Sequence, residues 1–435
     1  MDRRAWFFLA CAILIPWQLY HIATHPQFFR PPLPIGDGPD YETIGYSLSV
    51  GKGFSFAWDD PTWRAPYLAD AASDEYLHLK QNTKSGTTTA RPPLIPIALS
   101  AIYGAIGRDS RAFAVFRCLS ALAIGIAGSL AVFIAFELTQ KMVHDRWTLH
   151  VAATATLTFA FFDTTLRTYA VDFLSEPLAL LWTTVFLCCG LSLRNSSGPF
   201  KIFGLAVCMA AMIATRSMFV FWVPGILLIL LYSFRTKAIA KTLAFLVVVC
   251  LLLSPWCIRN CQQLQSFKPM GAQGPISIMG GYSDEALADQ GNWHPDADRR
   301  LRLILASAPG ANEWSNVELE RRLAVAASIE TRHWIKLHLR DLPYLCALRL
   351  KTHWGPYFGK SLIWRLGMLL GVAVLLMHRR WEAYWLLGIP LVSSLTVMLS
   401  YETGGRFLVP LYALLYALAG IGIAATFSKV CEIRR

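Results

Sequence analysis

The chain has 435 residues, of which 55% are hydrophobic and only 16% are charged. Its mean hydropathy is +0.42, and because soluble proteins have about 25% charged residues, the composition excludes an ordinary soluble protein. The net charge of +12 does not indicate nucleic-acid binding. Much of the excess lies in short loops between apolar runs, where Lys and Arg report membrane orientation.

Apolar runs long enough to cross a bilayer, about 20 residues each, recur along the chain. They are continuous rather than alternating, which favours an all-α polytopic membrane protein over a β-barrel. The first run has no small-x-small cleavage site, so we expect an uncleaved span rather than a signal peptide. We expect about ten spans, near residues 5–23, 112–136, 150–167, 176–193, 201–216, 218–234, 238–255, 361–378, 381–400 and 406–427.

Six basic clusters separate or flank these runs, and under this assignment all six fall on one side of the membrane. Positively charged loops face the cytoplasm, so we expect both termini to be cytoplasmic, with a bacterial inner membrane as the host membrane. The clusters are Arg3-Arg4, residues 141–146, 194–201, 235–241 and 378–380, and residues 429–435.

Two long segments then lie on the outer side, at about 24–111 and 256–360. The first contains a short amphipathic helix with Tyr41, Ile44 and Leu48 on one face. It ends in an apolar stretch to Ile106 that is too short for a span, and we expect an interfacial helix there.

The second outer segment is rich in Gly and Pro at first and then helical, with an apolar stripe formed by Leu319, Leu323, Ala326 and Ile329. The chain therefore divides into three parts. Residues 1–255 form a transmembrane core that includes the first outer loop, 256–360 a large outer loop, and 361–435 the C-terminal transmembrane helices.

Two acidic patches occur at span boundaries on the outer side. Asp37 and Asp40 flank Pro39 where a helix begins, and Asp172 and Glu176 lie between two spans. An alternative for the first patch is simple capping of the helix. Ionisable residues at membrane depth are costly and usually functional, so two patches on one side predict a shared cavity.

Four arginines are also expected outside, against the orientation rule for short loops: Arg91, Arg216, Arg259 and Arg406. A phosphate group at the outer interface explains such placements, because Arg binds phosphate oxygens bidentately. The alternative is snorkelling, or pairing with nearby acids such as Glu402. The sequence has no zinc motif, phosphate-binding glycine loop or nucleotide fingerprint.

These motifs, in this order, resemble the GT-C superfamily of polyprenyl-phosphate-sugar-dependent glycosyltransferases. The nearest branch is the one that holds lipid A aminoarabinose transferase and protein O-mannosyltransferases. The resemblance covers most of the chain and rests on five motifs: Asp37 with Asp40-Tyr41, Arg91-Pro92-Pro93-Leu94, Glu176-Pro177 with Asp172, Pro255-Trp256 with Arg259-Asn260, and Glu402 with Arg406-Phe407 through Pro410.

The chain departs from the family pattern at two places. The usual acid-acid pair of the first loop is Asp37-Gly38 here, so Asp37 or Asp40 is the candidate base. The Trp-Trp-Asp motif of oligosaccharyltransferases is absent, which argues against N-glycosylation.

The resemblance implies a single inverting displacement at the outer face. Asp37 would act as general base, a polyprenyl phosphate would leave, and arginines would stabilise its developing charge. Glu176 or Asp172 would orient the acceptor or hold a divalent ion, since some family members need a metal and others do not. The substrate-binding residues implied are Tyr41, Arg91, Arg216, Arg259, Asn260, Glu402 and Arg406.

The implied partners are a polyprenyl-phosphate sugar donor, a glycan, lipid or protein acceptor, and the lipid bilayer. Two other functions remain open on the sequence. One is a flippase or transporter of lipid-linked saccharides, although transporters usually place charges near the bilayer midplane. The other is a catalytically inactive protein that binds lipid-linked sugar.

Overall fold

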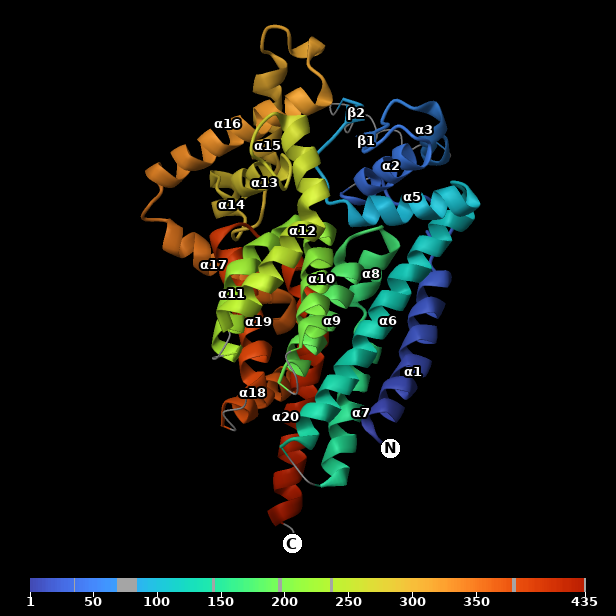
Figure 1. Cartoon of the computed structure of the whole chain (residues 1–435), viewed down its shortest axis with the longest axis vertical. Helices are drawn as coiled ribbons and strands as arrows, with labels where there is room; N and C mark the ends of the chain where they lie inside the picture. The colour runs from blue at the N-terminus through green and yellow to red at the C-terminus, as the bar shows by residue number, and fades with distance from the viewer. Residues whose placement is uncertain are drawn as a thin grey trace.

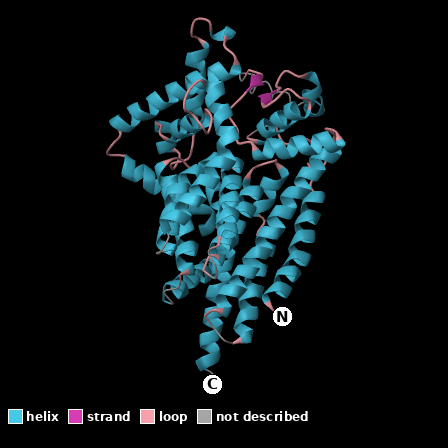
Figure 2. Ribbon diagram, viewed as in Figure 1, coloured by secondary structure: helices cyan, strands magenta, loops and turns pink. Residues whose placement is uncertain are grey.

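The computed structural model of the chain describes residues 1–34, 36–68, 84–142, 145–194, 198–234, 238–377 and 381–433, with side chains up to residue 428. Within these ranges the protein is almost entirely helical (Figures 1 and 2). Two short strands, β1 (Ser55–Phe56) and β2 (Gly86–Thr87), pair antiparallel. The predicted all-α fold is therefore confirmed.

The helices form a bundle with an additional layer at one end (Figure 1). The bundle contains α1 (Arg3–Ala23), α6 (Ser110–Gln140), α7 (Arg146–Phe162), α8 (Thr165–Val171), α9 (Glu176–Ser192), α10 (Pro199–Thr215), η1 (Ser217–Trp222), α11 (Val223–Phe234), α12 (Ala238–Leu264), α18 (Leu362–Met377), α19 (Glu382–Leu399), η3 (Arg406–Leu411) and α20 (Tyr412–Ile433).

The additional layer is made by the two long segments that were predicted to lie outside. It contains α2 (Gly38–Ser49), α3 (Pro61–Leu68), α5 (Leu94–Ile106), α13 (Gln273–Gly281), α14 (Asp284–Ala288), α15 (Pro295–Ala306), η2 (Ala311–Glu313) and α16 (Asn316–Leu337), and α17 (Leu342–Phe358) leads back to the bundle.

Among the described residues, six helices are long and apolar enough to cross a membrane, and two bent helix pairs raise the number to eight. The pairs are α8 with α9, bent by 120°, and α17 with α18, bent by 116°. The predicted spans at 150–167 and 201–216 fall on α7 and α10, which have only 17 residues each. The described part of the chain thus supports a polytopic membrane protein with six to eight spans.

Both termini lie at the end of the bundle opposite the additional layer (Figure 1). The junctions α6–α7, α9–α10, α11–α12 and α18–α19 lie toward that same end. Predicted basic clusters fall at these junctions in the sequence, but residues 143–144, 195–197, 235–237, 378–380 and 434–435 lie outside the described residues, and with them the whole of the cluster at 378–380. The described parts of the clusters at residues 3–4, 141–146, 194–201 and 238–241 therefore lie on one side of the fold. That this side faces the cytoplasm stays a prediction.

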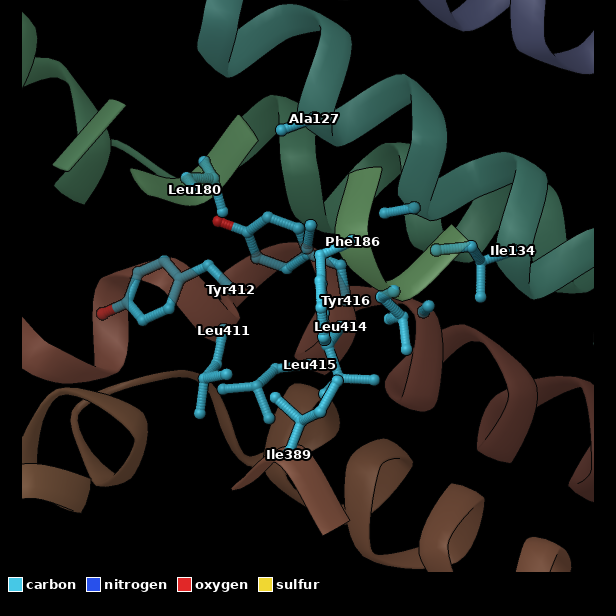
Figure 3. Close-up of a cluster of buried hydrophobic side chains, with 14 of the residues drawn as sticks. Ala127, Ile134, Leu180, Phe186, Ile389, Leu411, Tyr412, Leu414, Leu415 and Tyr416 are labelled. Carbon is cyan, nitrogen blue, oxygen red and sulfur yellow. The ribbon is translucent and has the colours of Figure 1, made fainter. Parts of the chain in front are cut away.

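The last helix is the centre of the bundle. Tyr412, Leu415 and Tyr416 pack against Phe186 of α9 and Ile389 of α19 (Figure 3). Helices in a membrane associate through close packing of small residues rather than through the hydrophobic effect. Accordingly, a methyl group added at Gly422 would lie 1.9 Å from the carbonyl oxygen of Gly367, so α18 and α20 are in backbone contact.

A buried carboxylate joins the helices of the first outer segment. Glu42 of α2 is fully buried and accepts hydrogen bonds from Trp63 and Tyr67 (3.1 Å), Tyr103 (3.0 Å) and Arg108 (2.5 Å). Because a buried charge is tolerated only when it is paired and hydrogen-bonded, these contacts hold α2, α3 and α5 as one unit.

The apolar stripe predicted on the later segment is confirmed except at its end. Leu323 is buried, and Leu319 and Ala326 pack with it against α13 and α15. Ile329, however, is 61% exposed, although Ala327, Thr331 and Trp334 on either side of it are buried. It therefore lies on a different face of α16 from the covered one.

Candidate functional site

A cavity of about 180 Å³ lies where the two outer segments meet the bundle. Its walls come from the start of α2, the turn before α5, the start of η1, α13 and the loop between α19 and η3. Six of its lining residues carry the chemistry discussed below: Asp37, Tyr41, Arg91, Arg216, Tyr401 and Arg406.

Asp37 reaches this cavity because of the local turn that starts α2. Gly36 has a φ of 69°, a conformation that suits glycine, and Pro39 occupies the first turn of the helix. Asp37 holds the capping position, but its side chain accepts no capping hydrogen bond. The capping alternative therefore does not account for this carboxylate, which is turned instead toward two arginines.

Those two arginines bind separate oxygens of Asp37. Arg91 Nη2 lies 2.9 Å from Oδ1, and Arg406 Nη2 lies 3.3 Å from Oδ2. Arg91 also donates to Asp40 through Nε at 2.9 Å and through Nη2. Asp40 is outside the cavity lining, so of the two candidate bases Asp37 is the one that faces the open space.

The charges in this region set the protonation of its neighbours. Burial lowers the pKa of Arg91, but the carboxylates of Asp37 and Asp40 outweigh burial and raise it. Burial, reinforced by the Asp37 carboxylate, raises the pKa of Tyr41 to about 12. At neutral pH Tyr41 is therefore a protonated phenol beside a charged guanidinium.

Glu176 binds two of the arginines that line the cavity. It is fully buried in the first turn of α9, and its Oε1 accepts hydrogen bonds from Arg216 Nη1 at 2.9 Å and Arg406 Nε at 2.7 Å. The Arg216 guanidinium also lies 4.8 Å from the ring centre of Phe407. Arg406 thus bridges the buried carboxylate of Glu176 and the cavity carboxylate of Asp37.

The cluster as a whole is electrically balanced. Its three arginines face the three carboxylates of Asp37, Asp40 and Glu176. An arginine has five N–H donors, and within the described residues the hydrogen bonds above use one donor of Arg216. The arrangement can therefore accept an additional anion only if that anion replaces a carboxylate at one of the arginines or binds their remaining donors.

Besides Asp40 and Glu176, four of the predicted site residues lie outside the cavity lining. Glu402 is fully buried, pairs with His353 Nδ1 at 2.8 Å and accepts from the backbone N–H of Thr403 and Gly405. Its contacts hold the turn that presents Arg406, rather than neutralising Arg406 as the pairing alternative supposed.

Arg259 and Asn260 make their contacts with residues of the two long segments rather than with the cavity. Arg259 donates to the carbonyl oxygen of Phe54 at 3.0 Å and lies over the rings of Phe54 and Trp256. Asn260 is buried and donates to the carbonyl oxygen of Pro269. These contacts join α12 to the first outer segment.

Asp172, the last of these four residues outside the cavity lining, contacts the site through its backbone. A methyl group added at Gly38 would lie 2.4 Å from the Asp172 carbonyl oxygen, so α2 begins in direct contact with the α8–α9 turn. Arg117 stabilises the same region, because it donates hydrogen bonds to the carbonyl oxygens of Val171, Phe28 and Arg30.

Sequence reasoning missed the wall formed by α13. Gln273 and Ser277 line the cavity from this helix, and Trp293 and Tyr401 lie next to it. The segment was expected to be a glycine-rich loop. A methyl group at Gly280 would lie 2.1 Å from Trp293, so the glycines allow this helix to pack closely. Their density in the sequence was the only feature that could have indicated such a packed helix.

No protein-family model matches the chain, and a search of curated proteins gives no match to it. Among the described residues, no group of three or more His, Cys, Asp or Glu side chains is placed to hold a metal ion.

Proposed function

We propose that the protein is an integral-membrane glycosyltransferase that moves a sugar from a polyprenyl-phosphate donor to an acceptor on the outer face of the membrane. The observation that carries the proposal is the position of Asp37. It is the one carboxylate among the described residues that line a cavity also lined by Arg91, Arg216 and Arg406. A base and a set of phosphate-binding cations are the two parts that such a reaction needs.

The proposed reaction is a single inverting displacement. The acceptor hydroxyl or amine gives its proton to Asp37 and forms a new bond to the anomeric carbon. The bond from that carbon to the phosphate oxygen breaks, and its electron pair leaves with the phosphate. The arginines stabilise the charge that develops on this oxygen.

Because Asp37 is paired with two arginines, donor binding also changes how strong a base Asp37 is. A carboxylate held by two guanidinium groups is a weak base, because opposite charges favour its ionised form. A donor phosphate that draws Arg91 and Arg406 toward itself frees Asp37 to accept a hydrogen bond from the acceptor. The base is thus activated when the donor is in place.

The choice of Asp37 over Asp40 rests on exposure and contacts. Asp40 is bound by two nitrogens of Arg91 and lies outside the cavity lining. In this proposal Asp40 positions Arg91 for the phosphate, while Asp37 receives the proton.

The topology proposed with this function places the cavity at the outer face of a bacterial inner membrane and both termini in the cytoplasm. It has ten spans, with α7 and α10 crossing the bilayer as short helices. In the bundle, α7 packs against α6 and α20, and α10 packs against α9 and α12.

The test uses cells that lack the gene, in which mass spectrometry of glycolipids and glycoproteins identifies the missing glycan. We expect the wild-type protein to restore this glycan and Asp37→Asn to lower its rate of formation by about 100-fold or more, the usual contribution of a positioned base. Asp289→Asn, at an exposed position of the outer layer, serves as the control and should restore the glycan fully.

Three results would contradict the assignment. Wild-type transfer by a well-folded Asp37→Asn protein would remove Asp37 as the base. Loss of transfer in the Asp40→Asn variant, with transfer retained in Asp37→Asn, would assign the role of general base to Asp40. An unchanged glycan profile in cells lacking the gene, together with movement of lipid-linked sugar across vesicle membranes by the purified protein, would favour a flippase.

A further inference from the structure

The second half of α16 and its link to α17 form a surface with an unusual combination of side chains. Arg332, Lys336 and Arg340 follow one another at intervals of four residues and are exposed. Between and after them, Leu337, Leu339 and Tyr344 are 67%, 62% and 61% exposed. We call residues 330–345 the α16–α17 corner.

The basic residues of the corner differ from those at the start of the same helix. There, Arg321 and Arg322 bind Glu318 at 2.7 Å and 2.5 Å. Within the described residues, Arg332, Lys336 and Arg340 make no ion pair, although Glu330 and Asp341 lie nearby in the sequence. The cations in the first half of α16 are thus paired within the helix, whereas the cations of the corner are available to bind an anion.

The corner lies level with the outer end of a candidate span. Cys346, in the second turn of α17, donates to the carbonyl oxygen of Met398 at 3.3 Å, and Arg349 donates to the same oxygen at 3.0 Å. Met398 is next to the last residue of α19, which is long and apolar enough to cross the membrane. Figure 1 shows α16 running away from the bundle and α17 returning to it.

From these observations we propose that the α16–α17 corner lies on the surface of the outer leaflet and binds the headgroups of anionic phospholipids. Leu337, Leu339 and Tyr344 enter the boundary between headgroups and acyl chains, where amphipathic segments bury their apolar residues. Arg332, Lys336 and Arg340 contact the lipid phosphates, as basic residues next to a bilayer do. The corner then holds the α13–α16 layer at a set height above the bundle.

Amide hydrogen exchange tests this proposal on the full chain, without reference to enzymatic activity. The protein is placed in nanodiscs of phosphatidylcholine alone, or of phosphatidylcholine with phosphatidylglycerol. We expect slower exchange of the backbone amides of residues 337–344 when phosphatidylglycerol is present. Each basic residue near an anionic surface strengthens binding by about fivefold, so Arg332→Gln with Lys336→Gln should remove most of this slowing.

The matched control changes the same number of charges in the same helix. Arg321→Gln with Arg322→Gln removes cations that already pair with Glu318, and the response to phosphatidylglycerol should persist. Equal exchange in both nanodiscs and in detergent would overturn the proposal. So would protection that arises in the absence of anionic lipid and depends on an added protein partner.

Discussion

At the scale of single residues, the site depends on how three arginines share three carboxylates. Glu176 is fully buried, while Asp37 has a side chain that is 27% exposed. A buried charge whose partner is removed costs far more than an exposed one. The two acids therefore have different expected phenotypes, since Glu176 supports the structure and Asp37 faces the cavity.

We expect Glu176→Gln to lower the free energy of unfolding by about 3 kcal/mol, because it leaves Arg216 and Arg406 without their buried counter-charge. Denaturation in detergent micelles measures the change. The control is Glu318→Gln, which breaks partly exposed pairs with Arg321 and Arg322 and should cost less than about 1 kcal/mol. Equal losses in the two variants would contradict the structural role given to Glu176.

At the scale of elements, the site depends on where α2 begins. Gly38 lies against the Asp172 carbonyl oxygen without room for a side chain. Backbone atoms move less easily than the end of a side chain, so α2 and the α8–α9 turn are in fixed contact. That contact places Asp37, the residue before Gly38, above Glu176.

Gly38→Ala should therefore shift the start of α2 and lower transfer at least tenfold while the bundle stays folded, as overpacking usually costs about 1–3 kcal/mol. Glycan formation in complemented cells and the denaturation midpoint measure the two effects. The control is Gly104→Ala in α5, where an added methyl group has nothing within 4 Å. That change should leave transfer unaltered and stabilise the helix slightly; a loss of activity in both variants would show that Gly38 has no special role.

At the scale of the whole molecule, the fold separates the two chain termini from the cavity. The termini lie at one end of the bundle (Figure 1). The cavity lies at the other, where the outer segments meet the bundle. In the proposed function, a lipid-linked donor reaches this cavity from the bilayer and its acceptor arrives from the outer solvent.

Reporter fusions to the C-terminus test this orientation. If basic loops face the cytoplasm, a fused fluorescent protein of the type that folds only in the cytoplasm should fluoresce. A fused periplasmic phosphatase should be inactive at the same position and active when inserted after residue 310, in the outer layer. The reverse pattern would invert the topology and place Asp37 on the cytoplasmic side.

The sequence by itself determined the membrane class, the helical fold and the one-sided distribution of basic loops, because these follow from the local succession of apolar and charged residues. It also named the cavity residues Asp37, Arg91, Arg216 and Arg406, since charges next to membrane spans are few. It did not reveal α13 as a wall, because close packing of glycines against Trp293 and Tyr401 is a contact between distant segments.

Only the tertiary structure decided which charges meet. In the sequence Glu402 is the nearest acid to Arg406, four residues away, yet Glu402 pairs with His353 and Arg406 binds Glu176 and Asp37. The sequence left Asp40 as an alternative to Asp37; in the fold Arg91 binds both, and of the two only Asp37 lines the cavity. The reason is physical: the energy of a buried charge depends on the distances to its partners, and residues far apart in the chain set those distances.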